Sequence, residues 1–92
     1  MSELLQMQEL LKEKADCQAR LNLIPYDGSP EIKEQSGKKY LYVRKRIAGK
    51  LTSTYVDIYS DELYQLLLRN ARDARALNKR IRQIEKELSN IG

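Results

Sequence analysis

The sequence predicts one α+β domain over residues 1–92: an N-terminal helix, a loop, a two-stranded antiparallel β-hairpin and a long C-terminal coiled-coil helix packed antiparallel on the first. Two observations predict the helices, because apolar residues recur at spacings of three and four near the N-terminus and repeat in heptads near the C-terminus. Between these segments, alternating apolar and polar residues predict the hairpin. The predicted boundaries are residues 1–22, 23–37, 38–59 and 60–91.

The first helix, residues 1–22, consists of helix-forming residues without Gly or Pro. Ser2 is a suitable N-cap for it. Its apolar residues form one stripe, which contains Leu4, Met7, Leu10, Leu11, Cys17 and Leu21. Because a buried cysteine usually behaves as a small hydrophobe, we interpret Cys17 as a core residue and not as a nucleophile.

Residues 23–37 are predicted to form a loop, because four interruptions fall within a short span. These are Pro25, Asp27-Gly28, Ser29-Pro30 and Ser36-Gly37. The acidic residues around Asp27 do not match the ligand spacing of a calcium loop.

The register of the hairpin follows from the parity of its apolar residues. Those of the first strand have odd numbers and those of the second have even numbers, so they share a face only if the loop between the strands has an even length. This pairs Leu41 with Val56 and Val43 with Thr54, around a two-residue Ala48-Gly49 loop or a four-residue loop over 47–50. Since alanine is unfavourable at positive φ, the longer loop is the preferred prediction, with Gly49 in the left-handed region.

The opposite face of the hairpin is predicted to collect aromatic and basic side chains. Tyr42 and Tyr55 are expected to be direct neighbours across the strands. The residues assigned to this face are Tyr40, Tyr42, Arg44 and Arg46 on the first strand and Ser53, Tyr55, Asp57 and Tyr59 on the second.

The last helix is predicted to begin after Ser60, a suitable cap, with Asp61 and Glu62 in its first turn. Its heptads place Leu67, Ala74, Ile81 and Leu88 at a, and Leu63, Asn70, Leu77, Ile84 and Ile91 at d. The polar exception, Asn70, either specifies the pairing of helices or lies where solvent reaches the seam. The outward positions form a basic stripe, Arg69, Arg72, Arg75, Lys79, Arg82 and Lys86.

The length of the last helix predicts self-association. At about 1.5 Å per residue it is roughly 45 Å long, against roughly 30 Å for the first helix. If the helices pack antiparallel with Asn22 beside Ser60, the first helix reaches only as far as Lys79 or Arg80, and four aliphatic side chains then lack a partner in the same chain. We therefore expect a homodimer that pairs the C-terminal helices through Ile81, Ile84, Leu88 and Ile91.

The composition argues against several classes of protein. The chain has no histidine and one cysteine, which leaves almost no zinc ligands, no general base near pH 7 and no intrachain disulfide, so we expect neither an enzyme nor a cofactor or metal site. No signal peptide and no membrane-spanning run is present, which predicts a soluble cytoplasmic protein without membrane contact. Residues 1–36 carry 4 basic and 7 acidic residues, whereas residues 37–92 carry 13 and 6, so the positive charge lies in the hairpin and the last helix.

Nucleic-acid binding is the first functional hypothesis. Arg and Lys neutralise phosphates, tyrosines stack on bases, and a two-stranded ribbon fits a major groove. The candidate residues are Lys39, Tyr40, Tyr42, Arg44, Arg46, Lys50 and Tyr55. The alternative is a protein–protein adaptor or regulator of an adjacent gene product, because tyrosines are ordinary strand residues and basic residues also protect sheet edges from aggregation.

The run "KKYLYVRKRIAGKLTSTYVDIYSDELYQLL", with the later "RIRQIEKEL", resembles short uncharacterised bacterial proteins. In these, an aromatic strand, a Gly-Lys turn and a Ser-x-Tyr strand lead into a long charged helix, and the resemblance covers about residues 38–88. Some such proteins accompany mobile-element genes, which implies DNA, but they carry a cysteine cluster where this chain has "IPYDGSPEIKEQSG". Others stand beside Fic-type toxins, yet the inhibitory Ser/Thr-x-x-x-Glu-Gly/Asn pattern of Fic partners does not occur in this chain.

Overall fold

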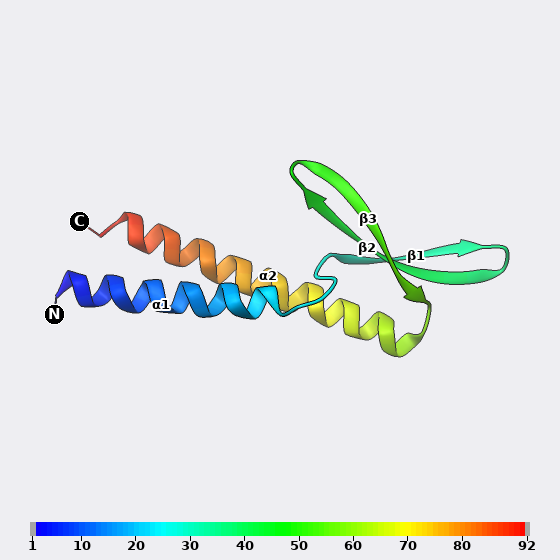
Figure 1. The fold of residues 1–92 in the computed structure, drawn as a ribbon, viewed down its shortest axis with the longest axis horizontal. Helices are drawn as coiled ribbons and strands as arrows, with labels where there is room; N and C mark the ends of the chain where they lie inside the picture. The colour runs from blue at the N-terminus through cyan, green and yellow to red at the C-terminus, as the bar shows by residue number, and fades with distance from the viewer. Residues whose placement is uncertain (1, 92) are drawn as a thin grey trace. The chain divides into compact units, whose positions relative to one another are not determined.

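The computed structural model describes residues 2–91 and confirms an α+β architecture (Figure 1). The elements in chain order are α1 (Glu3–Asn22), β1 (Ser29–Gln35), β2 (Lys38–Ile47), β3 (Lys50–Ile58) and α2 (Asp61–Ser89). They form two compact units: a sheet unit, Pro25–Asp73, and a helical unit, in which the chain up to Ile24 packs with the chain from Ala74 onwards. Neither of the two helices is long and apolar enough to cross a membrane.

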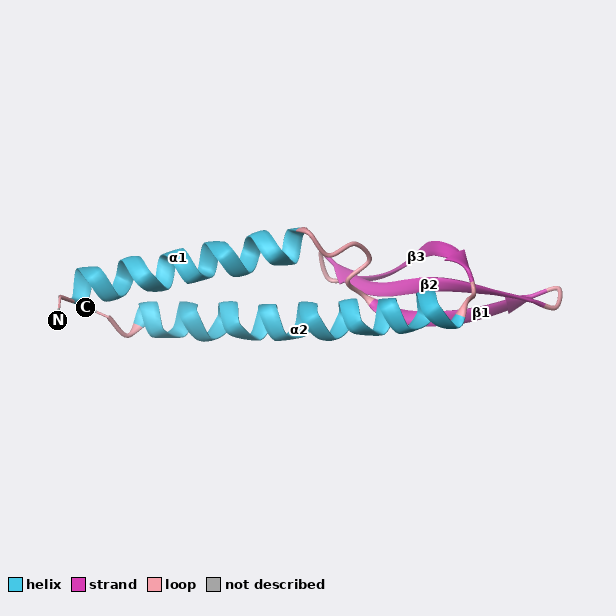
Figure 2. Ribbon diagram, turned by 90° about the horizontal axis from the view of Figure 1, so that it is seen from below, coloured by secondary structure: helices cyan, strands magenta, loops and turns pink. Residues whose placement is uncertain are grey.

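In the helical unit, α1 lies antiparallel beside the C-terminal half of α2 (Figure 2). The Ser2 Oγ accepts a hydrogen bond of 3.2 Å from the Leu4 N–H and caps α1 as predicted. A bidentate ion pair joins the helices, because the Arg80 guanidinium donates two hydrogen bonds to the Glu13 carboxylate. These bonds lower the pKa of Glu13 and raise that of Arg80. The buried apolar residues are Leu10, Cys17, Ala74, Ile81 and Ile84.

The predicted overhang of α2 is wrong. Ile81 is 7% exposed and Ile84 is fully buried within the chain, while Leu88 and Ile91 are half-buried. The prediction placed the end of α1 beside Ser60, but the N-terminal half of α2 packs in the sheet unit and α1 packs with the C-terminal half. The unpaired seam that motivated a homodimer is therefore absent from the described residues, and pairing of two chains stays a prediction without that support.

The heptad seam itself is confirmed along both halves of α2, because Leu67, Ala74, Ile81 and Ile84 are buried. Asn70, the polar exception, has a local role that the pattern did not reveal. Its Nδ2 donates a hydrogen bond of 2.9 Å to the Pro25 carbonyl in the sheet unit. It therefore satisfies a backbone acceptor of the chain entering the sheet.

The sheet has three antiparallel strands in the order β1-β2-β3, so the hairpin predicted from the sequence gains a strand. Strand β1 lies in the segment expected to be a loop. Ser36 and Gly37, at φ 53° and 79°, form the two-residue turn that pairs β1 with β2. Turns with two positive φ values match the twist of a hairpin, which is why this pair joins strands and does not end them. Pro30 is compatible with β1 because β1 is an edge strand.

The register predicted for β2 and β3 is confirmed for Val43 with Thr54 and for Tyr42 with Tyr55. A bulge then places Leu41 opposite Asp57, so the predicted pairing of Leu41 with Val56 is wrong. The one-residue shift reverses the faces beyond it. Ile58 now pairs with Tyr40, and Tyr59 packs towards the core and not on the outer face.

The turn between β2 and β3 is the two-residue Ala48-Gly49 loop, so the preference for the longer loop is wrong. Ala48 has φ 51° and Gly49 has φ 81°. The shorter turn lets Ile47 pair with Lys50 and suits the twist of the strands, at the cost of a left-handed alanine.

The core of the sheet unit lies between one face of the sheet and the first turns of α2. Leu41, Val43 and Leu67 are 0–5% exposed and form its centre. The Ser60 Oγ accepts a hydrogen bond of 3.1 Å from the Leu63 N–H and begins α2 at the end of this face. Partly buried residues surround the centre, namely Val56, Tyr59, Leu63 and Tyr64. Within the sheet unit, α2 covers one face of the sheet and leaves the other face uncovered.

The burial of Ile84 predicts that Ile84→Ala lowers the free energy of unfolding by about 2–5 kcal/mol, because it removes buried methyl groups and leaves a cavity. Urea unfolding measures this change. The control is Gln83→Ala, on the exposed neighbour. Gln83→Ala should lower the free energy of unfolding by about 0.5 kcal/mol or less. If Ile84→Ala lowers it by no more than that, the side chain of Ile84 does not lie in a core.

The strained turn predicts that Ala48→Asn raises the free energy of unfolding by about 0.5–1 kcal/mol, because Asn adopts positive φ at lower cost. Gly49→Ala should lower it by about 1–2 kcal/mol. A Cβ at Gly49 meets no atom within 4 Å, so this loss would report backbone strain alone. Thermal melts of both variants test the turn, and a neutral Gly49→Ala would contradict it.

Candidate functional site

The sheet face opposite Leu41 and Val43 carries the candidate site. The strand register brings Glu31 of β1, Tyr42 of β2 and Tyr55 of β3 into one row across this face. The next row contains Lys33, Tyr40 and Ile58. We call this surface the tyrosine face, which comprises Glu31, Lys33, Lys38, Tyr40, Tyr42, Arg44, Arg46, Tyr55 and Ile58.

The three tyrosines form one aromatic cluster. The rings of Tyr42 and Tyr55 meet edge to face, with centroids 5.4 Å apart and planes at 71°. The rings of Tyr40 and Tyr55 are 6.2 Å apart and tilted by 56°. Tyr55 remains 48% exposed, and Ile58 beside it is 60% exposed. The cluster therefore presents aromatic and aliphatic area to whatever contacts this face.

Hydroxyl groups add hydrogen-bonding capacity to the cluster. Partial burial, and secondarily the Asp57 carboxylate, raise the pKa of Tyr55 above its ordinary value of 10.0. Its phenol is thus protonated at neutral pH and can donate a hydrogen bond. An open hollow beside Tyr40 and Tyr42 is also lined by Lys33, Glu34 and Gln35.

A carboxylate lies among the positive charges of the face. Glu31 is 3.3 Å from the Arg44 Nε and 3.6 Å from the Lys33 Nζ. The Lys33 ammonium lies 4.3 Å from the centre of the Tyr42 ring, a cation–π contact. Glu31 and Lys33 were not predicted as site residues, because both lie in the segment that was expected to be a loop. The signal that could have found them is Ser36-Gly37, read as the turn of a hairpin.

The structure brings together five of the seven residues predicted for nucleic-acid contact, Tyr40, Tyr42, Arg44, Arg46 and Tyr55. The other two lie elsewhere, because strand alternation places Lys39 and Lys50 on the side of Leu41 and Val43. The Lys39 Nζ is 5.9 Å from the centre of the Tyr59 ring, which packs on the core. Lys45, also on that side, holds Asp27 with 2.8 Å hydrogen bonds.

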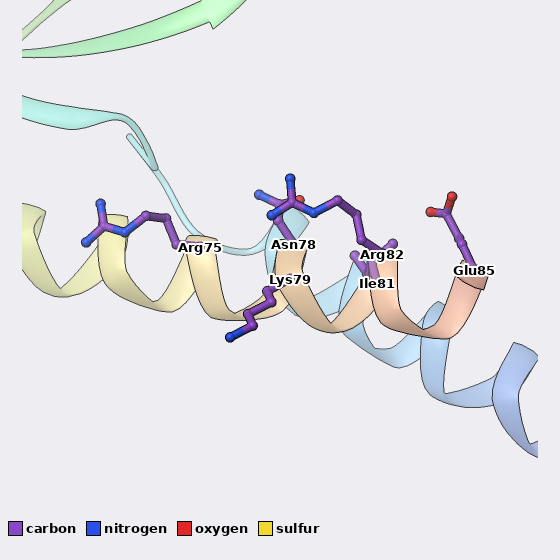
Figure 3. A pocket seen from close by; sticks show the side chains of 6 residues that line it. All are labelled: Arg75, Asn78, Lys79, Ile81, Arg82 and Glu85. Atoms are coloured by element: carbon purple, nitrogen blue, oxygen red, sulfur yellow. The ribbon is translucent and has the colours of Figure 1, made fainter. Parts of the chain in front are cut away.

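The basic stripe of α2 shows a different arrangement. In the helical unit it borders a shallow hollow, around which Arg75, Asn78, Arg82 and Glu85 point to one side and Lys79 points away (Figure 3). Glu85 interrupts the positive charge and lies 3.9 Å from the Lys14 Nζ. The stripe lacks aromatic residues, so it matches an ordinary solvated helix surface.

Residues 2–91 do not contain the side-chain arrangement of a metal site. No three His, Cys, Asp or Glu side chains converge there as metal ligands. Cys17 is a free thiol that is 8% exposed. It lies in the helical core, as its place on the apolar stripe predicted.

Comparison with known proteins gives one result for this chain. A family model described as Domain of unknown function (DUF6788) matches residues 4–65, which is more than half of the sequence. The match includes α1 from Leu4 onwards, the three strands of the tyrosine face and the first turn of α2. No curated protein and no solved structure matches the chain.

The aromatic cluster predicts an energetic coupling between Tyr42 and Tyr55. In a double-mutant cycle with Tyr42→Ala and Tyr55→Ala, we expect a coupling of about 0.5–1.5 kcal/mol in the free energy of unfolding. The control is a cycle of Tyr55→Ala with Tyr64→Ala, which should show no coupling because Tyr64 belongs to α2 and packs on the core, on the other side of the sheet from Tyr55. Equal couplings in the two cycles would show that the rings do not meet as described.

Proposed function

The chain belongs to the family described as Domain of unknown function (DUF6788), and we propose that it is a small, non-enzymatic nucleic-acid-binding accessory protein that acts through the tyrosine face. The observation that carries this proposal is a sheet face that α2 leaves open, with three tyrosines in contact at its centre. Exposed aromatic rings of this kind offer stacking surfaces for bases, worth about 1–3 kcal/mol per base.

The charge of the sheet supports the same partner. The three strands carry seven basic residues against three acidic ones, so this part of the chain is net positive by four. On the tyrosine face itself, Lys38 lies at one end of β2, and Arg44 and Arg46 lie at the other. Exposed cations at both ends of an aromatic cluster match a ligand that combines phosphates with bases.

The experiment is fluorescence anisotropy with labelled 20-nucleotide DNA and RNA, as single strands and as duplexes. We expect binding at 20 mM salt. With three or four phosphate contacts, affinity between 50 and 200 mM salt should fall about 40- to 150-fold for a duplex and about 20- to 50-fold for a single strand. Binding of no oligonucleotide at 20 mM salt would reject the proposal. The adaptor alternative predicts instead an apolar contact with a protein that salt affects little.

Substitution places the contact on the molecule. Arg44→Ala with Arg46→Ala should weaken binding about tenfold and reduce the salt slope by about two. Thermal stability should change little, because both side chains are exposed and their ion pairs contribute at most about 1 kcal/mol. The charge-matched control is Lys12→Ala with Arg20→Ala on the exposed surface of α1. An equal loss in the control would show that the binding depends on net charge and not on the tyrosine face.

A further inference from the structure

We propose that the tyrosine face binds single-stranded nucleic acid, with the bases turned toward the sheet, in preference to a duplex. This inference rests on the proposed function and names the kind of nucleic acid. It also replaces the earlier hypothesis of a two-stranded ribbon in a major groove. Three features support it: the order of side chains along β2, the carboxylate in the row of Tyr42 and Tyr55, and the width of the sheet.

The outward residues of β2 are sorted by chemistry. Read along the strand, they are Lys38, Tyr40, Tyr42, Arg44 and Arg46. Alternate residues of a strand are roughly 6.6 Å apart, so the row spans about 26 Å. Aromatic rings occupy the middle and cations the two ends. A flexible single strand can place unpaired bases on the rings while its phosphates reach the cations.

The middle row of the face is less favourable for phosphate than its two ends. Glu31 of the edge strand β1 lies in this row next to Tyr42 and within ion-pair distance of Arg44 and Lys33, and its carboxylate offsets one of their two positive charges. A carboxylate repels phosphate oxygens but accepts hydrogen bonds from amino groups on base edges. In a duplex, the Watson–Crick edges are paired and phosphates line each groove. The row of Glu31, Tyr42 and Tyr55 therefore fits exposed bases.

The width of the sheet points in the same direction. A major groove about 12 Å wide admits a helix or a two-stranded ribbon. Strand β1 makes this sheet three strands wide at about 4.8 Å per strand, before side chains are counted. The exposed surface of Tyr55 and the hollow beside Tyr40 and Tyr42 are open to bases that are free to leave a stack.

The test compares a 12-nucleotide single strand of mixed sequence with its own duplex, in DNA and RNA versions, at 50 mM salt. We expect the single strand to bind at least about tenfold more tightly. Tyr42→Ala should weaken it about 5- to 160-fold, as expected for the loss of stacking on one base, while Tyr42→Phe retains most of the affinity. The chain has six tyrosines and no tryptophan, so tyrosine fluorescence can be followed, and the part of its quenching on binding that Tyr42→Phe removes reports stacking on this ring.

The control is Tyr59→Phe on the covered side of the sheet, with circular dichroism to confirm that every variant folds. A duplex that binds as tightly as the single strand overturns this inference and leaves the proposed function in place. Tyr42→Ala that folds and keeps full affinity overturns it as well. Binding of neither form would reject the proposed function itself.

Discussion

The packing of Leu67 against Leu41 and Val43 is the contact on which the sheet unit depends. These three side chains are almost fully buried, and they come from the central strand and from the second turn of α2. Because α2 packs on Leu41 and Val43, one face of the sheet is buried in the core. Alternation along β2 then determines the other face, because every residue next to a buried one must point outward. The outward residues of β2 on the tyrosine face are therefore those that alternate in sequence with the core residues.

The bulge in β3 shows how sensitive such a face is to one residue. Up to Tyr55, the outward positions of β3 follow from simple alternation. One extra residue then brings Ile58 to the tyrosine face and turns the Tyr59 ring toward the core. The Tyr59 hydroxyl donates a hydrogen bond of 2.5 Å to the exposed Asp61 carboxylate. This bond is the main reason that the pKa of Tyr59 is raised. Tyr59 and Ser60, which follow the shifted end of β3, connect it directly to the start of α2.

The sequence predicted the features that depend on local pattern and missed those that depend on distant contacts. Heptads located the seam of α2, and parity located Tyr42 opposite Tyr55. The bulge has no signature in the residues around it, because an extra residue in a strand is decided by packing. Glu31 and Lys33 were missed because Ser36-Gly37 resembles a loop as much as a turn. The burial of Ile81 and Ile84 depends on which half of α2 packs on the sheet. The heptad periodicity is the same in both halves, so it does not predict this.

The division of the chain into units has a consequence for the order of folding. The sheet unit is one continuous segment, Pro25–Asp73, closed by two tight turns, so its contacts form over short loops. The helical unit joins the two ends of the described chain, and its contacts close the longest loop in the molecule. Once the sheet has formed, that loop is effectively shorter and the entropy lost on closing it is smaller. During synthesis, α1 therefore remains an exposed amphipathic segment until the C-terminal half of α2 has left the ribosome.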